Sequence, residues 1–248
     1  IVMRTKNIII ITILLTFLLS GCLVKSLHPF YTEKDRFFRQ ELVGKWMDQD
    51  SMIWTFSKTT ISEFMGEAKE DESYEVVLED PSGEEKESWF RVNLFALNGA
   101  TYLDFEPHVD VNIGDHFAAM HFVPTHSVAR VDFFGEGNFS FVWYDEEWLN
   151  ELFEQNRIKI SHEVINTQNS LYDQSYILTA DTRELQKFLL KYGEEINIFN
   201  EIDRDKVLDN KNYDEIWKAL EKDINENMEK DAFIGSDLIF SNLKKINE

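Results

Sequence analysis

Short runs in which apolar and polar residues alternate fill the range 42–144. In the run SMIWTFS, residues 51–57, the large apolar residues Met52, Trp54 and Phe56 fall on one face. A period of two is typical of a β-strand that buries one face. The region therefore predicts about six to eight short strands in an antiparallel barrel or sandwich.

Two hairpins are predicted within this region. The dipeptide Asn98-Gly99 separates two alternating runs, and both residues tolerate the positive φ that a two-residue hairpin turn requires. A second hairpin is predicted where GEGN, residues 135–138, separates ARVDFF, residues 129–134, from FSFVWY, residues 139–144. Its inward-facing residues would be Val131, Phe133, Phe139, Phe141 and Trp143.

After Tyr144 the apolar residues recur at the spacing of helices. Asp145 is placed to cap a first helix, and Asp181 with Glu184 three residues later forms a capping box for a second. A third helical stretch is expected from about Asn212 onward. The sequence thus predicts a mainly β (α+β) fold, an antiparallel barrel or barrel-like sheet with C-terminal helices.

The first residues have the pattern of a secretory signal. Arg4 and Lys6 precede an apolar stretch from Ile8 to Leu19, and two small residues then precede Cys22. The stretch spans 12 residues, too few to cross a bilayer core, since that takes about 20. We therefore expect a leader that is cleaved off.

The four residues Leu19-Ser20-Gly21-Cys22 resemble the bacterial lipobox. That resemblance implies cleavage between Gly21 and Cys22, and attachment of acyl chains such as palmitate to Cys22. The alternative is a free cysteine buried in an uncleaved helix. Cys22 is the only cysteine of the chain, so acylation would leave no thiol for a disulfide, a metal ion or catalysis.

The lipobox resemblance also implies a location. Leu23 follows the cysteine in place of the aspartate that retains lipoproteins in an inner membrane, so we expect the outer membrane, with the lipid bilayer as partner.

The expected layout is a signal peptide at 1–21, the lipidated cysteine and a tether at 22–40, an antiparallel β domain with packed helices at 41–199, and a helical C-terminal appendage at 200–248.

The net charge of the chain limits the classes of partner that it is expected to bind. The formal net charge is −21 at pH 7, and an acidic surface repels phosphate backbones. We therefore expect no nucleic-acid partner. The same charge repels anionic lipid headgroups, although acidity of this kind also simply favours solubility.

Gly44-Lys45-Trp46, near the start of the strand series, resembles the G-x-W signature of the lipocalin and calycin barrels. In that family an arginine packs over the tryptophan, and Arg130 is the matching position here. Together with the leader, the order of LHPFYTEKD, LVGKW and WTF resembles a group of uncharacterised bacterial lipoproteins with a lipocalin-like body. The long helical C-terminus departs from the family pattern, which usually has one helix.

The resemblance implies a small apolar ligand inside a cup-shaped barrel. An eight-stranded barrel is just wide enough to hold one small ligand or to be filled by its own side chains. The aromatic residues that would line the interior suit either arrangement: Trp46, Trp54, Phe56, Phe90, Phe133, Phe141 and Trp143. A packed core and a ligand cavity both remain open from sequence.

The sequence offers little chemistry. His116, His121 and His126 lie five residues apart, which fits neither helix nor strand spacing for a metal site, so they are weak candidates at best. The chain contains no G-x-S-x-G, H-E-x-x-H or P-loop motif. We therefore expect no cofactor and no catalytic residue.

Two functions follow as hypotheses. The first is a membrane-anchored, non-enzymatic lipoprotein of the bacterial cell envelope that holds a small apolar ligand in its barrel. The second is a structural or assembly protein of the envelope that contacts a protein partner through its C-terminal helices.

Overall fold

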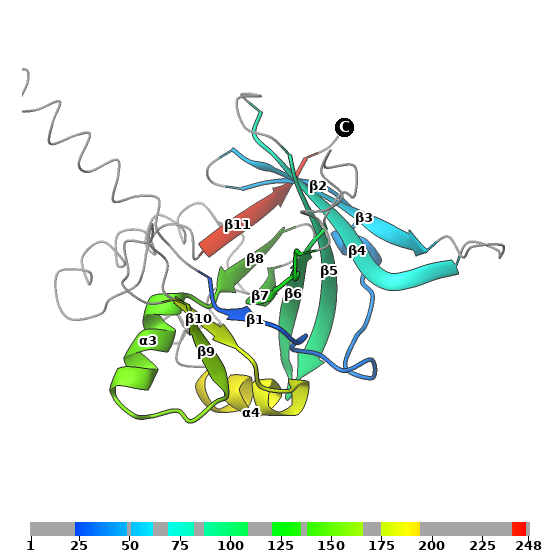
Figure 1. Ribbon diagram of the computed structural model, residues 1–248. Helices are drawn as coiled ribbons and strands as arrows, with labels where there is room; N and C mark the ends of the chain where they lie inside the picture. The colour runs from blue at the N-terminus through cyan, green and yellow to red at the C-terminus, as the bar shows by residue number, and fades with distance from the viewer. Residues whose placement is uncertain are drawn as a thin grey trace, which may run out of the picture.

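The protein forms a closed, eight-stranded antiparallel β-barrel in a computed structural model that describes residues 23–48, 51–61, 69–81, 87–108, 121–134, 138–165, 175–193 and 240–246 (Figure 1). The barrel strands are β2 (Gly44–Met47), β3 (Ile53–Ile61), β4 (Lys69–Glu79), β5 (Ser88–Leu97), β6 (Ala100–Pro107), β7 (His126–Phe134), β8 (Asn138–Trp143) and β11 (Phe240–Lys245). Each strand pairs antiparallel with its neighbours. The expected fold class is confirmed, and it is consistent with a lipocalin-like barrel.

Two pairings close the barrel. Strand β6 pairs with β7, for example Leu103 with Ala129. Strand β11, drawn in red in Figure 1, inserts between β8 and β2, with Leu243 opposite Phe139 and Lys245 opposite Trp46. The last strand of the described chain is therefore a wall of the barrel.

The two predicted hairpins are present, because the strands on either side of each turn pair with one another. Asn98 and Gly99 connect β5 to β6 with φ of 51° and 85°. Both values are positive, as a type I′ turn requires. The second hairpin joins β7 to β8, and its predicted inward residues lie in or against the barrel core.

Three short strands extend the sheet beyond the barrel. They are β1 (Lys25–Ser26), β9 (His162–Ile165) and β10 (Ser175–Leu178), and a 3-10 turn, η1 (Gln40–Leu42), precedes β2. Strand β1 pairs antiparallel with β7 and parallel with β10, and β10 pairs with β9.

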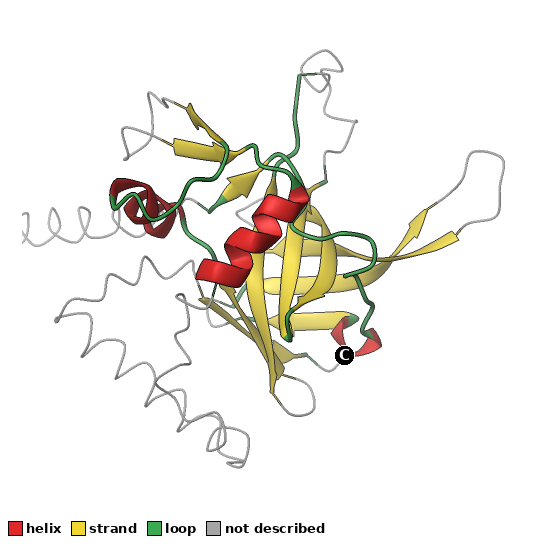
Figure 2. Cartoon of the chain, turned by 90° about the horizontal axis from the view of Figure 1, so that it is seen from below, coloured by secondary structure: helices red, strands yellow, loops and turns green. Residues whose placement is uncertain are grey.

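Two helices pack on the outer wall of the barrel. They are α3 (Glu146–Glu154) and α4 (Thr182–Tyr192), and Figure 2 shows α4 lying across the barrel strands. Asp145 accepts a hydrogen bond from Trp148 N, and Asp181 accepts one from Glu184 N, as the predicted caps require. A second apolar cluster, which includes Phe95, fills the space between this wall and the helices.

Alternation along each strand separates the two cores. Inward-facing residues form the barrel core, whereas the residues between them face the helices or the solvent. On β5, for example, Val92 and Leu94 belong to the barrel core, and Phe95 belongs to the outer cluster.

Two expectations about the ends of the domain were wrong. Residues 23–40 are not a free tether, because Val24 and Phe30 are fully buried and Lys25–Ser26 is strand β1. The range 200–248 was expected to be helical, but its described part forms strand β11. The rest of that range, 200–239 and 247–248, lies outside the described residues, and so does the helix predicted from Asn212.

Candidate functional site

The barrel interior is filled with aromatic rings. Trp54 lies edge-on to Phe141 at 5.3 Å between ring centroids, and Phe105 lies 4.4 Å from Trp143. Such edge-to-face and tilted contacts stabilise aromatic pairs beyond the area that they bury. The rings therefore make a continuous packed core across the barrel.

All the predicted lining residues are placed in this core or against it. Trp46, Trp54, Phe56, Phe141 and Trp143 are buried members of the cluster, and Phe90 and Phe133 pack against it while partly buried. Each of the seven rings contacts at least one other aromatic ring. This arrangement favours the packed-core interpretation over a ligand cavity.

The Gly44–Trp46 signature lies where the barrel closes. Trp46 Nε1 donates a hydrogen bond to Leu42 O at 2.8 Å, which ties the tryptophan to η1. Lys245 Nζ stands 5.2 Å from the Trp46 ring centroid and lies 3.3 Å from both Glu41 O and Val43 O. A cation on the last strand thus covers the tryptophan and bonds to the turn that precedes it.

The assignment of this cation to Arg130 was wrong. Arg130 pairs with Tyr102 and Val142, and its neighbours Ala129 and Val131 are the residues that face the barrel core. Because side chains alternate along a strand, Arg130 points to the outer face. The side chain over Trp46 is Lys245.

His126, one of the three histidine candidates, is part of a buried pair. Its Nδ1 lies 2.7 Å from Asp104 Oδ1, and the other carboxylate oxygen of Asp104 accepts a hydrogen bond from Phe30 N at 2.9 Å. Asp104 is fully buried. The pair therefore ties the N-terminal segment, residues 23–40, to strands β6 and β7, which is a structural task.

The environment of this pair perturbs both of its groups. Burial raises the pKa of Asp104, and the hydrogen bond and charge of His126 offset only part of that rise. Burial would lower the pKa of His126, but the hydrogen bond and charge of Asp104 outweigh it, so the pKa of the imidazole is raised. The native pair consequently holds a proton to higher pH than the free side chains would.

The histidines do not assemble into a metal site within the described chain. His116 lies outside the described residues, and His121 lies in the segment before β7. Across the described ranges, no three His, Cys, Asp or Glu side chains come together as metal ligands would.

A groove lined mostly by charged and polar residues lies between the N-terminal segment and α4. It has a volume of about 620 Å³ and is open to the surface. Three of its residues belong to the segment and four to one face of α4, and the full lining is Thr32, Glu33, Lys34, Arg183, Gln186, Lys187 and Leu190. We call this feature the α4 groove.

Hydrogen bonds tie the two walls of the α4 groove together. Gln186 Nε2 donates to Asp35 Oδ2 at 2.8 Å and to Phe30 O at 3.2 Å. Thr32 N also donates to Asp35 Oδ2. Burial alone would raise the pKa of Asp35, but the hydrogen bonds from Thr32 and Gln186 outweigh it and hold that pKa below its ordinary value.

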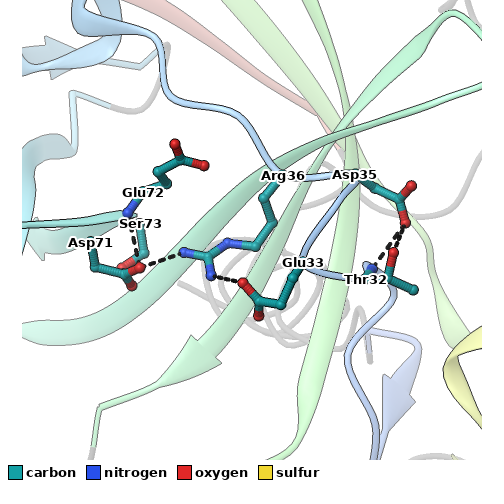
Figure 3. A network of polar contacts seen from close by, with 7 residues as sticks. All are labelled: Thr32, Glu33, Asp35, Arg36, Asp71, Glu72 and Ser73. Carbon is teal, nitrogen blue, oxygen red and sulfur yellow. Dashed lines mark hydrogen bonds and ion pairs between the residues drawn. The ribbon is translucent and has the colours of Figure 1, made fainter.

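A network of ion pairs and hydrogen bonds holds the N-terminal segment on strand β4, as Figure 3 shows. The Arg36 guanidinium contacts Glu33 Oε2 at 2.7 Å and Asp71 Oδ1 at 2.9 Å, and Ser73 Oγ donates to Asp71 Oδ2. The side chains of Arg36 and Asp71 are 8% and 24% exposed, so this ion pair is largely shielded from water, whereas Glu33 is 81% exposed. The segment wall of the groove is therefore held on β4.

The lipidation candidates Gly21 and Cys22 lie outside the described residues, but the residues directly after them are part of the fold. Leu23 forms a β-bridge with Asp145 and packs against the barrel core. Val24 N donates to Tyr144 O at 2.8 Å. The described part of the fold thus begins at the first residue after Cys22.

No helix among the described residues is both long enough and apolar enough to span a bilayer. No family model matches the chain, and neither a curated protein nor a solved structure matches it.

The α4 groove could not be predicted from the sequence, because its residues come from segments far apart in the chain.

Proposed function

We propose that this protein is a non-enzymatic lipoprotein of the bacterial cell envelope, anchored through acyl chains on Cys22, and that its barrel is a packed scaffold for contacts made by the outer surface. The outer membrane is the proposed location, because Leu23 follows the cysteine. The observation that carries the proposal is that the lipobox-like residues 19–22, which end in Cys22, are followed directly by Leu23, a residue of the folded chain.

The anchor would hold the barrel directly at the membrane. Leu23 and Val24 already contact the barrel and the outer cluster, so no free linker would separate the acylated residue from the fold. Each acyl CH₂ that enters the bilayer contributes about 0.8 kcal/mol, and more than one chain is needed for stable anchoring. The described fold would therefore present a restricted set of surfaces away from the bilayer.

Contacts on the outer surface fit the geometry better than a ligand inside the barrel. The interior aromatic residues contact one another, and most are buried. A ligand would have to displace those contacts, and packed interiors resist such displacement. A protein partner in the envelope is accordingly the favoured binding target.

Labelling with radioactive palmitate in an expressing bacterium tests the anchor. The wild-type chain should take up the label and sediment with membranes, whereas Cys22→Ser should do neither. Because Cys22 is the only cysteine, no second thiol can take the label. Equal membrane association of the serine variant would refute the proposal.

A partner that binds through the chain after β10 and α4 requires a different test. Deleting all of 200–248 would also remove β11 and open the barrel. Replacing only 200–239 with a flexible linker keeps β11. Loss of a cross-linked envelope partner in that variant, with unchanged thermal unfolding, would support the assembly role.

A small apolar ligand in the barrel is a second candidate. Phe90 and Phe133 are only partly buried, which leaves apolar surface at the edge of the core. Native mass spectrometry of the delipidated protein would detect a retained apolar molecule. A mass equal to that of the bare chain would argue for the packed core alone.

A further inference from the structure

We infer that the α4 groove binds a phosphate group, carried by a small organic phosphate or by a phospholipid headgroup. This inference concerns a binding site and does not depend on acylation of Cys22. It rests on the charge, the framework and the shape of the groove.

The charge of the α4 groove is opposite to that of the protein. The chain carries a formal net charge of −21, yet three cations line this one groove: Lys34, Arg183 and Lys187. The acidic lining residue is Glu33, and its carboxylate is engaged by Arg36. Convergent positive charge within an acidic surface concentrates an anion at that place.

The spacing of the cations on α4 makes them converge. Gln186 and Lys187 lie three and four residues after Arg183, and Leu190 lies four and three residues after them, so all four occupy one face of the helix. Lys34 faces them from the N-terminal segment. An anion between the two walls would meet cationic groups from both sides.

These cations are not held in ion pairs within the described residues, although the charge of Lys34 acts on the neighbouring Asp35 carboxylate. Neither Lys34, Arg183 nor Lys187 forms an ion pair with any carboxylate in the ranges that the structure describes. Arg36, in contrast, is fixed by Glu33 and Asp71. Arg36 therefore stabilises the fold, whereas the three groove cations remain available to a ligand.

The framework of the groove is already built. Gln186 bonds to Asp35 and to the Phe30 carbonyl, which fixes the distance between the walls. Arg36 holds the segment against β4 through Asp71 (Figure 3). A preformed arrangement of charges costs little ordering on binding, and that favours affinity.

A phosphate monoester fits this arrangement better than a single carboxylate does. A phosphate monoester carries close to two negative charges near pH 7 and three acceptor oxygens. Arginine binds phosphate with two parallel N–H groups, and lysine supplies a point charge. Leu190, 48% exposed in the lining, offers apolar surface to the organic part of the ligand.

The test uses the full-length protein and two probes. Glycerol 1-phosphate in solution, titrated by isothermal calorimetry, represents the free phosphate source. Phosphatidylcholine vesicles with and without phosphatidylglycerol represent the headgroup source, and here the Cys22→Ser variant separates groove binding from the acyl anchor. Saturable binding of either probe supports the inference and identifies its source.

The double variant Arg183→Gln and Lys187→Gln assigns the binding to the groove. We expect at least about a tenfold weaker binding, because two charge-assisted contacts to the phosphate are lost. The matched control, Lys45→Gln with Lys159→Gln, removes the same charge from exposed positions outside the groove and should retain the affinity. Both pairs lie on the surface, so folding should be kept.

Three outcomes would overturn the inference. They are no saturable binding of either probe, equal binding by the wild type and the groove variant, and an equal loss in the groove and control variants. The last would show that net charge alone, rather than this groove, attracts the anion. None of these outcomes bears on palmitate labelling of Cys22, so the two proposals fail separately.

Discussion

Lys245 Nζ lies 5.2 Å from the centre of the Trp46 ring and within 3.3 Å of the carbonyl oxygens of Glu41 and Val43. The contact joins the last barrel strand, β11, to the first, β2, and to the turn before it. A cation over a tryptophan face is attracted by the ring quadrupole. The Lys245 side chain thus adds to the strand pairing that closes the barrel at this seam.

We expect Lys245→Met to lower the free energy of unfolding by about 1–2 kcal/mol, since it removes the cation–π contact and the hydrogen bonds while keeping an apolar stem. Lys245→Arg should retain most of the stability. Urea unfolding followed by tryptophan fluorescence measures both. Lys45→Met, on the exposed face of β2, is the control, and an equal loss there would contradict the seam role.

Gly44 makes the same seam possible through its backbone. Its φ is +137°, and a Cβ at this position would stand 3.1 Å from Lys245 Cε. Gly44→Ala should therefore cost about 1–3 kcal/mol, mainly because an L residue is strained at this φ. Thermal unfolding of Gly44→Ala in a Lys245→Ala background, which has no side-chain atom at the place of Cε, separates strain from contact. A loss that disappears in this background would mean that crowding dominates.

Much of the barrel could be predicted from sequence because its signals are local. Alternation identified the inward residues of β3, β5, β7 and β8, and the Asn98-Gly99 pair located one turn. Strand β11 gave no such signal, because its pairing to β2 and β8 comes from distant parts of the chain. The segment 23–40 was wrongly expected to be a tether, because its burial depends on tertiary contacts. One of these is the hydrogen bond from Phe30 N to Asp104 Oδ2.

The candidate sites were less predictable than the fold. The aromatic interior followed from alternation, but whether it is filled depends on ring contacts across the barrel. The cation over Trp46 was misassigned to Arg130, because β11 was not recognised as a strand. The α4 groove combines Lys34 with Arg183 and Lys187, and no local pattern indicates that these residues meet.

The Asp104–His126 pair should make stability depend on pH. The pKa of His126 is raised above its ordinary value of 6.5 by Asp104, and the pKa of Asp104 is raised by burial above 3.8. The native state therefore binds protons that the unfolded state has released. Stability from the imidazole is fully present below pH 6.5 and declines as the pH rises through the raised native value.

Urea unfolding midpoints at a series of pH values above 6.5 measure this decline. His126→Gln should flatten it, because glutamine cannot titrate. Asp104→Asn should flatten it too while retaining an acceptor for Phe30 N. His162→Gln, in which the altered histidine lies outside the pair, is the control. A wild-type slope that persists in both pair variants would show that other groups cause it.

The C-terminal strand should be essential to the barrel. Leu243 on β11 is fully buried in the barrel core, opposite Phe139. Leu243→Ala should therefore lower the free energy of unfolding by about 2–5 kcal/mol, through lost burial and the cavity left behind. Lys244→Ala, the exposed neighbour on the same strand, should change it by about 0.5 kcal/mol or less.

Truncation after residue 239 extends this test. Without β11, strands β8 and β2 lose their shared partner, and the aromatic core that includes Trp46 and Phe139 opens at the seam. The truncated chain should bind a hydrophobic dye and lose its near-ultraviolet circular dichroism, as chains without fixed side-chain packing do. Because an appendage could be removed without these changes, a truncated protein that unfolds at the wild-type midpoint would contradict the place of β11 in the wall.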